Sequence, residues 1–137
     1  MEEKVRKALK ERINMTDEDI DRLWPGIQKL ESRMEEIVDK WKIVAECTSS
    51  KYCSAGIKVG DKFAFKGYVL IPEECTATLC LSALSPILGR LYIIFERLIE
   101  GLDPNGLCLA SAHCGDTGVE HGGSGRVTFK VYAERIK

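Results

Sequence analysis

Residues 41–48, WKIVAECT, mark the place where the spacing of apolar positions changes from a helical period to a period of two. Before residue 41 the apolar residues recur every three or four positions, which is typical of amphipathic helices. From residue 41 they recur at every second position, which is typical of a strand buried on one face: Trp41, Ile43, Ala45 and Cys47. The change predicts a helical arm over 1–40 and a separate domain over 41–137.

The arm is predicted to be helical throughout. Thr16 has the position of an N-cap residue, with Asp19 three residues later, which is close to a capping box. Pro25 and Gly26 either interrupt that helix or start the next one. The last helix carries one apolar face that must pack on the rest of the protein or on another copy of it: Ile27, Leu30, Met34, Ile37, Val38 and Trp41. We therefore expect the arm to serve packing or homo-oligomerisation.

Three more strands and one long helix are expected after the first strand. KFAFKGYVL (62–70) follows a KVGD turn and is predicted to be the second strand. A helix is predicted over 79–102, with Thr78 as a possible N-cap and with Pro86 either kinking it or starting a fresh helix. The third and fourth strands are predicted over LCLASAHC (107–114) and over RVTFKVYAERI (126–136), in which apolar and polar residues alternate. The order ββαββ predicts an α+β fold, in which the helix covers one face of a four-stranded, mostly antiparallel sheet.

Composition argues against charged partners. Twenty basic and 21 acidic side chains leave a net charge of −1 in 137 residues. We therefore expect neither a nucleic acid nor an anionic membrane as partner. The most apolar stretch, LCLSALSPILGRLYIIF (79–95), is interrupted by polar residues and is interpreted as a buried helix. Because the first fifteen residues lack the apolar run of a signal peptide, we expect a cytoplasmic protein with reduced thiols.

Six cysteines are more than packing needs in such a protein. None forms a CxxC pair, so the local spacings of zinc ribbons and ferredoxins are absent. Their positions are more informative, because most lie at the ends of expected elements, where strand ends and a helix N-terminus can converge: Cys47, Cys53, Cys75, Cys80 and Cys114. A helix N-terminus also favours thiolates or an anionic cluster. This placement favours a metal or iron–sulfur site. The alternative for each cysteine is that it serves as a small buried apolar residue. Cys108, deeper in its strand, is expected in the core.

Nucleophilic catalysis is another use of these thiols. A Cys–His pair requires the two side chains to meet. His113 precedes Cys114 on the expected strand and points to the opposite face, whereas His121, in the glycine-rich loop 115–125, could reach it. That loop matches neither a P-loop nor a dinucleotide-binding pattern, so phosphate binding there is not expected. The loop carboxylates are interpreted as solvated turn residues: Asp61, Glu73, Glu74, Asp103 and Asp116.

Four stretches carry a resemblance to a known family: CSAGIKVGDKF (53–63), PEECTATLCLSAL (72–84), SAHCGD (111–116) and VTFKVYAERI (127–136). Through them residues 42–137 resemble an uncharacterised family of small cysteine-containing proteins of bacteria and archaea, frequently anaerobes. That family pairs a C-x-x-G-x-K-V-G-D turn with a cysteine that opens the helix and a cysteine before an acidic residue. The matching positions here are Cys53, Cys80 and Cys114, and Cys47 has a frequent counterpart. The resemblance implies a shared fold and a shared site, and it brings no established activity.

The chain also departs from the family pattern. It adds the helical segment 1–40, carries Cys75 and Cys108 as extra cysteines, and has a long glycine-rich loop over 115–125. A proline that commonly follows the last cysteine of the family is Gly115 here. These departures leave the local turn after Cys114 open.

Three hypotheses follow. The first is a small metal-binding protein with an iron–sulfur cluster, or zinc as the alternative, on Cys47, Cys53, Cys80 and Cys114, with Cys75 as substitute. It would act in electron transfer with a protein redox partner or as an accessory subunit in anaerobic metabolism. The second is a metal-free homo-oligomeric binding or scaffold protein whose arm makes the interface. The third is a thiol-dependent redox enzyme with Cys114 or Cys53 as the reactive group; no motif identifies a reaction.

Overall fold

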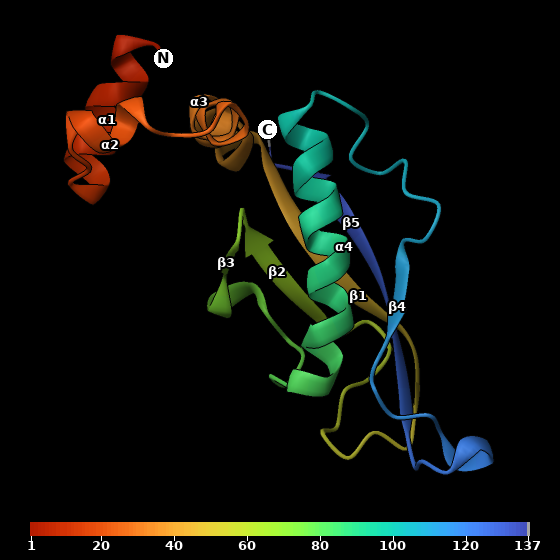
Figure 1. Ribbon diagram of the computed structural model, residues 1–137. Helices are drawn as coiled ribbons and strands as arrows, with labels where there is room; N and C mark the ends of the chain where they lie inside the picture. The colour runs from red at the N-terminus through yellow and green to blue at the C-terminus, as the bar shows by residue number, and fades with distance from the viewer. Residues whose placement is uncertain (137) are drawn as a thin grey trace.

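One long antiparallel pairing runs through the middle of the fold. In the computed structural model, which describes residues 1–136, β1 (Trp41–Lys51) pairs with β5 (Arg126–Arg135). Three shorter strands complete an antiparallel sheet of order β3-β2-β1-β5-β4 (Figure 1): β2 (Lys62–Lys66), β3 (Val69–Leu70) and β4 (Ser111–His113). The α+β class is therefore as expected, but the sheet formed by residues 1–136 has five strands instead of four.

The additional strand arises because the segment 62–70 is a hairpin. Lys66 pairs with Val69, and Gly67 and Tyr68 form the two-residue loop between them. Gly67 has a φ of +60°, in the left-handed region that glycine adopts without steric cost. The segment 62–70, which the apolar pattern predicts as one strand, thus contains a tight turn.

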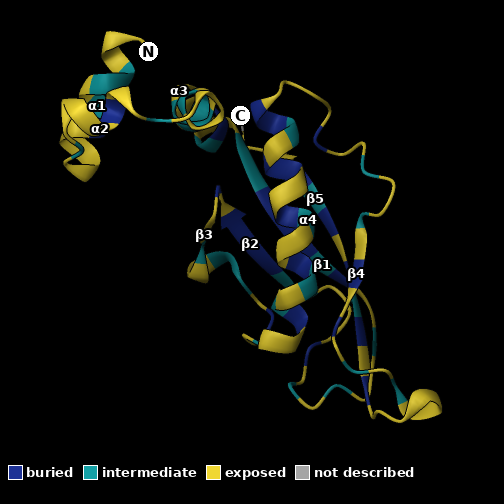
Figure 2. Ribbon diagram, in the orientation of Figure 1, coloured by how far each residue is buried: buried dark blue, intermediate teal, exposed yellow. Residues whose placement is uncertain are grey.

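Helix α4 (Leu81–Ile99) covers one face of the sheet (Figure 1). Its buried positions alternate with exposed ones (Figure 2) and join the core of the sheet: Ala83, Ile87, Leu91, Ile94, Phe95, Leu98 and Ile99. The helix starts two residues later than predicted, and Pro86 lies inside one continuous helix. Leu88 and Leu102, which are apolar residues of the range predicted to form the buried helix, are exposed. None of the helices within residues 1–136 combines the length and the apolar character needed to cross a membrane.

The strand predicted over 107–114 is shorter in the structure, and the expected burial of Cys108 is wrong. β4 covers only Ser111–His113, and Cys108 is exposed in the irregular segment before it. The reason is that the Asn105 side chain forms hydrogen bonds to the backbone of the neighbouring strand β5. Asn105 accepts a hydrogen bond from the Ala133 N–H (2.8 Å) and donates one to the Ala133 carbonyl (3.0 Å). Backbone groups that a longer β4 would have paired with are thereby satisfied.

The arm contains α1 (Glu3–Ile13), α2 (Asp17–Asp21) and α3 (Pro25–Lys40). The predicted N-cap is confirmed, because the Thr16 hydroxyl accepts a hydrogen bond from the Asp19 N–H (3.2 Å). Pro25 starts α3, in agreement with one of the two expectations. Leu9 and Ile20 are the buried residues of α1 and α2, which lie away from the sheet (Figure 1).

Helix α3 is attached to the domain. Ile37 is buried in the common core, with Leu30 and Met34 packed against it. The Arg33 guanidinium donates a 2.6 Å hydrogen bond to the Ile99 carbonyl at the end of α4, where a cation also complements the helix dipole. Lys29 and Glu100 add an ion pair of 2.9 Å. The last helix of the arm is thus fixed to α4 by apolar and polar contacts.

Candidate thiol site

Three of the predicted site cysteines line one cavity of about 110 Å³. Cys53 comes from the turn after β1, Cys80 from the start of α4, and Cys114 from the residue after β4. Segments that are far apart in the sequence therefore bring their thiols to the same place. We call this space, lined also by Asp116 and Gly125, the thiol cavity.

Two consecutive turns position Cys53. The Gly56 N–H donates to the Cys53 carbonyl (3.1 Å), and the Asp61 N–H donates to the Lys58 carbonyl (3.0 Å). Gly56 and Gly60 have φ values of +74° and +93°. A type II turn requires a residue with positive φ, usually glycine, at its third position, and Gly60 has this position in the second turn. The backbone conformation therefore requires glycine at both glycine positions of the C-x-x-G-x-K-V-G-D pattern. The half-buried Cys53 side chain lines the cavity.

Cys47 lies beside this site but does not line the cavity. Its side chain is only 1% exposed, and its Sγ donates to the Ser49 carbonyl (3.4 Å) across an irregularity in the pairing of β1 with β5. Burial is the largest cause that raises the pKa of the Cys47 thiol above its ordinary value. The buried thiol therefore stays protonated at neutral pH and is a poor ligand in this state.

Cys80 is the N-cap residue of α4, in place of the expected Thr78. Its carbonyl accepts hydrogen bonds from the N–H groups of Ala83 and Leu84 (3.2 and 3.0 Å). Ser82 and Ala83, in the first turn, also line the thiol cavity. The cavity is thus at the positive end of the α4 dipole, where negative charge is favoured.

Cys114 is held by β5 and is buried. Its N–H donates to the Val127 carbonyl (2.9 Å), and its Sγ accepts a hydrogen bond from the Val127 N–H (3.4 Å). No histidine in residues 1–136 lines the cavity with it. The His113 ring lies 2.7 Å from the Cys114 carbonyl, and His121 lines a different cavity. The structure therefore does not form the Cys–His pair considered above.

The two extra cysteines do not line the cavity. Cys75 Sγ lies 3.2 Å from the Ile71 carbonyl and accepts a hydrogen bond from the Ala64 N–H (3.3 Å), beside the β2–β3 hairpin. Cys108 is exposed. All six cysteines are free thiols.

Asp116 organises the glycine-rich loop next to Cys114. Its carboxylate accepts four hydrogen bonds of 2.8–2.9 Å, from the N–H groups of Gly118, Ser124 and Gly125 and from the Ser124 hydroxyl. These bonds, with the one from Gly118 the largest cause, lower the pKa of Asp116 to about 2. The sequence predicts a solvated turn residue at Asp116, whereas the structure makes it the acceptor that holds the loop together. The signal for this in the sequence is an aspartate near the start of a loop of several glycines, whose N–H groups can converge on one carboxylate.

Two glycines of this region are sites of close approach. A Cβ on Gly125 would lie 2.0 Å from the Tyr52 carbonyl oxygen, so the loop 115–125 and the turn after β1 meet at backbone distance. Tyr52 itself has a φ of +56°. The Gly115 N–H donates to the Ser82 hydroxyl (2.9 Å), a bond that a proline at this position would remove. Gly115 thus contacts the first turn of α4 through its N–H group.

The four expected ligands do not form a metal site as they lie. Within residues 1–136, no group of three or more His, Cys, Asp or Glu side chains is arranged to hold a metal ion. Cys47 does not line the cavity shared by the other three. The arrangement is that of separate thiols around a small space.

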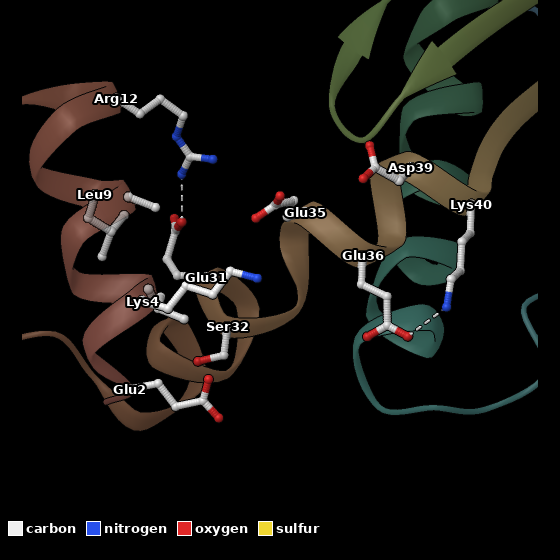
Figure 3. Close-up of a pocket in the computed structure, with 12 residues that line it drawn as sticks. Glu2, Lys4, Leu9, Arg12, Glu31, Ser32, Glu35, Glu36, Asp39 and Lys40 are labelled. Carbon is white, nitrogen blue, oxygen red and sulfur yellow. Dashed lines mark hydrogen bonds and ion pairs between the residues drawn. The ribbon is translucent and has the colours of Figure 1, made fainter.

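A larger cavity, of about 410 Å³, lies between α1 and α3 (Figure 3). Its walls carry mixed charges, including the ion pair of Arg12 with Glu31 (2.9 Å) that joins the two helices. It is lined by neither cysteine nor histidine. The thiol cavity is therefore the better candidate for chemistry.

Comparisons of the chain with protein-family models, with curated proteins and with solved structures find no match.

Replacing Gly125 by alanine should disrupt the contact of the two loops. Because the new Cβ would meet backbone atoms, we expect a loss of at least about 2 kcal/mol in the free energy of unfolding. Gly89→Ala is the matched control, since Gly89 lies inside α4 with nothing within 4 Å of its Cβ position. It should stabilise the protein by about 0.5–1 kcal/mol. Urea denaturation compares the two, and a neutral Gly125→Ala would contradict the close approach.

Acid should release the loop 115–125 at unusually low pH. Folding lowers the pKa of Asp116 from its ordinary 3.8 to about 2, so its stabilising contribution is complete above about pH 4 and is lost as the pH falls through about 2. The amide resonances of Gly118, Ser124 and Gly125 should titrate together with a midpoint of about 2. This step should vanish in Asp116→Asn. A midpoint near the ordinary value would contradict the hydrogen bonding described above.

Proposed function

We propose that the protein acts through the thiol cavity, binding a small ligand that forms bonds to sulfur. The observation that carries the proposal is the convergence of Cys53, Cys80 and Cys114 from three distant segments on one space of about 110 Å³. Cysteine sulfur reacts as a nucleophile and is a soft ligand, so a space lined by three cysteines suits a thiophilic molecule or ion.

Three features of the structure support this function. The walls are fixed, because the Asp116 hydrogen bonds and the Tyr52–Gly125 contact hold both loops. The N-terminus of α4 adds a field that favours negative charge, as on a thiolate or an anionic ligand. The thiols remain accessible, since Cys53 and Cys80 are only half-buried. Packing alone would not need this combination of rigid walls and open thiols.

The reactivity of the cysteines tests this proposal. In the full-length reduced protein under limited iodoacetamide, Cys53 or Cys80 should be alkylated several-fold faster than Cys108, as quantified by peptide mass spectrometry. Cys108 is the internal control, because it is more exposed than either and does not line the cavity. If the cavity thiols serve packing only, rates should follow exposure and Cys108 should react first. That order would overturn the proposal.

An iron–sulfur cluster, or zinc, on Cys47, Cys53, Cys80 and Cys114 is a second proposal. The observation that favours it is that three of the four expected ligands line the same cavity. It requires a rearrangement, since the side chains as they lie form no metal site among residues 1–136. Electron transfer or an accessory role in anaerobic metabolism would follow from a cluster, with a protein redox partner.

Metal and acid-labile sulfide content, with a visible spectrum, test this second proposal on anaerobically purified protein. It expects stoichiometric iron and sulfide, or stoichiometric zinc, that is lost in Cys80→Ser and retained in Cys108→Ser. Colourless, metal-free protein would contradict it and leave the thiol function.

A homo-oligomer formed through the arm is a separate proposal, supported by exposed apolar residues at the helix ends. Trp24 is 80% exposed, and Ile13 and Ile27 are also exposed. Light scattering should then show an oligomer for the full chain that weakens in Trp24→Ser. Leu109→Ser, an equally exposed apolar position outside the arm, is the control and should leave the mass unchanged. A monomeric full-length protein would contradict the proposal.

A further inference from the structure

A second cavity, of about 190 Å³, adjoins the thiol cavity. Tyr52 lines both. The loop 115–125 also contributes to both cavities. Asp116 and Gly125 line the thiol cavity, and their neighbours Thr117 and Ser124 line the second cavity. The two cavities therefore share walls made by the same loop and the same tyrosine.

Two cationic side chains line this second cavity. Lys51 and Arg126 face each other across the last pair of the β1–β5 ladder. Among residues 1–136 neither has a carboxylate partner within 4.0 Å, and the Lys51 ammonium lies 5.2 Å from the centre of the Tyr52 ring. Like charges at directly opposite positions destabilise a pair of strands. The arrangement therefore opposes folding locally, and an anion bound between the two cations would relieve the repulsion.

Acidic groups nearby do not cancel the two cations. Glu120 also lines the cavity, so the balance of charged side chains there is two positive to one negative, with His121 in addition. The Asp116 carboxylate lines the thiol cavity and not this one, and its four hydrogen bonds hold it there. The hydroxyls of the lining residues Thr117 and Ser124 already donate to the His121 carbonyl (2.8 Å) and to the Asp116 carboxylate (2.9 Å), so the donors for an anion come from Lys51 and Arg126.

We infer that the second cavity binds the anionic group of the ligand whose thiophilic centre enters the thiol cavity. The inference rests on the thiol function proposed above and names the class of ligand. It is a small organic anion, with a carboxylate, sulfonate or phosphate group held by Lys51 and Arg126, that carries a sulfur-reactive centre a few bonds away. Cation pairs of this kind bind such groups by charge-assisted hydrogen bonds.

Three methanethiosulfonates that share an ethyl spacer and carry an anionic, a neutral or a cationic head group test the inference: the 2-sulfonatoethyl, 2-hydroxyethyl and 2-trimethylammonioethyl reagents. In each reaction the cysteine thiolate attacks the sulfenyl sulfur, a mixed disulfide forms and methanesulfinate leaves, the thiol proton having gone to solvent. The rate at each cavity cysteine of the full-length protein is divided by the rate at Cys108 in the same sample. This ratio removes the intrinsic difference among the reagents.

The expected order of these ratios at Cys53 or Cys80 is anionic above neutral above cationic, by several-fold between the extremes. The double variant Lys51→Gln/Arg126→Gln should abolish the order, whereas Lys51→Arg should keep it. Lys130→Gln is the control, because Lys130 lies on the same strand β5 and lines neither cavity. It should leave the order unchanged.

Failure of this inference is distinguishable from failure of the thiol function. Cavity cysteines that react readily, but with equal ratios for the three charges or with an order that survives in the double variant, would overturn the anion site alone. Cavity cysteines that react with none of the reagents, while Cys108 does, would overturn both.

Discussion

The long antiparallel pairing of β1 with β5 organises the sheet, the helix that covers it and the two loops of the thiol cavity. It joins Trp41 to Arg135 at one end and Lys51 to Arg126 at the other, and its inward side chains form the floor on which α4 packs. Beyond the Lys51 end the chain continues directly into Tyr52 on one strand and arrives from Gly125 on the other. The thiol cavity is therefore built on the end of this ladder, and the two loops that wall it begin where the pairing stops.

The sequence predicts much of this arrangement, because the spacing of apolar residues indicates the strands and the helix, and the cysteines lie at the ends of these elements. The alternating pattern of 126–136 yields the buried face of β5, and the apolar period of 79–102 yields α4. Cysteines at a turn, at a helix start and at a strand end were expected to converge, and Cys53, Cys80 and Cys114 line one cavity. Topology makes this happen, since α4 begins at the same edge where β1 and β4 end.

Other features depend on contacts between distant residues and leave little local trace. Cys47 has the right position in the sequence, yet its side chain points into the core, next to an irregularity in pairing that no alternation of residues reveals. Asn105 shortens β4 by bonding to Ala133, which is a long-range contact. Asp116 closes its loop through four donors that meet only in the folded chain. Gly67 divides one apolar run into two strands because its φ is positive.

Three thiols from separate segments share one space. A short bifunctional alkylating reagent that fluoresces only after bridging two thiols tests this arrangement most directly, with peptide mass spectrometry to identify the bridged pair. We expect a bridge between two of Cys53, Cys80 and Cys114 in the native protein, and a much lower yield of that bridge in the unfolded chain, where these thiols meet only by closing long loops. Bridges that involve Cys75 or Cys108, or single adducts alone, would contradict it.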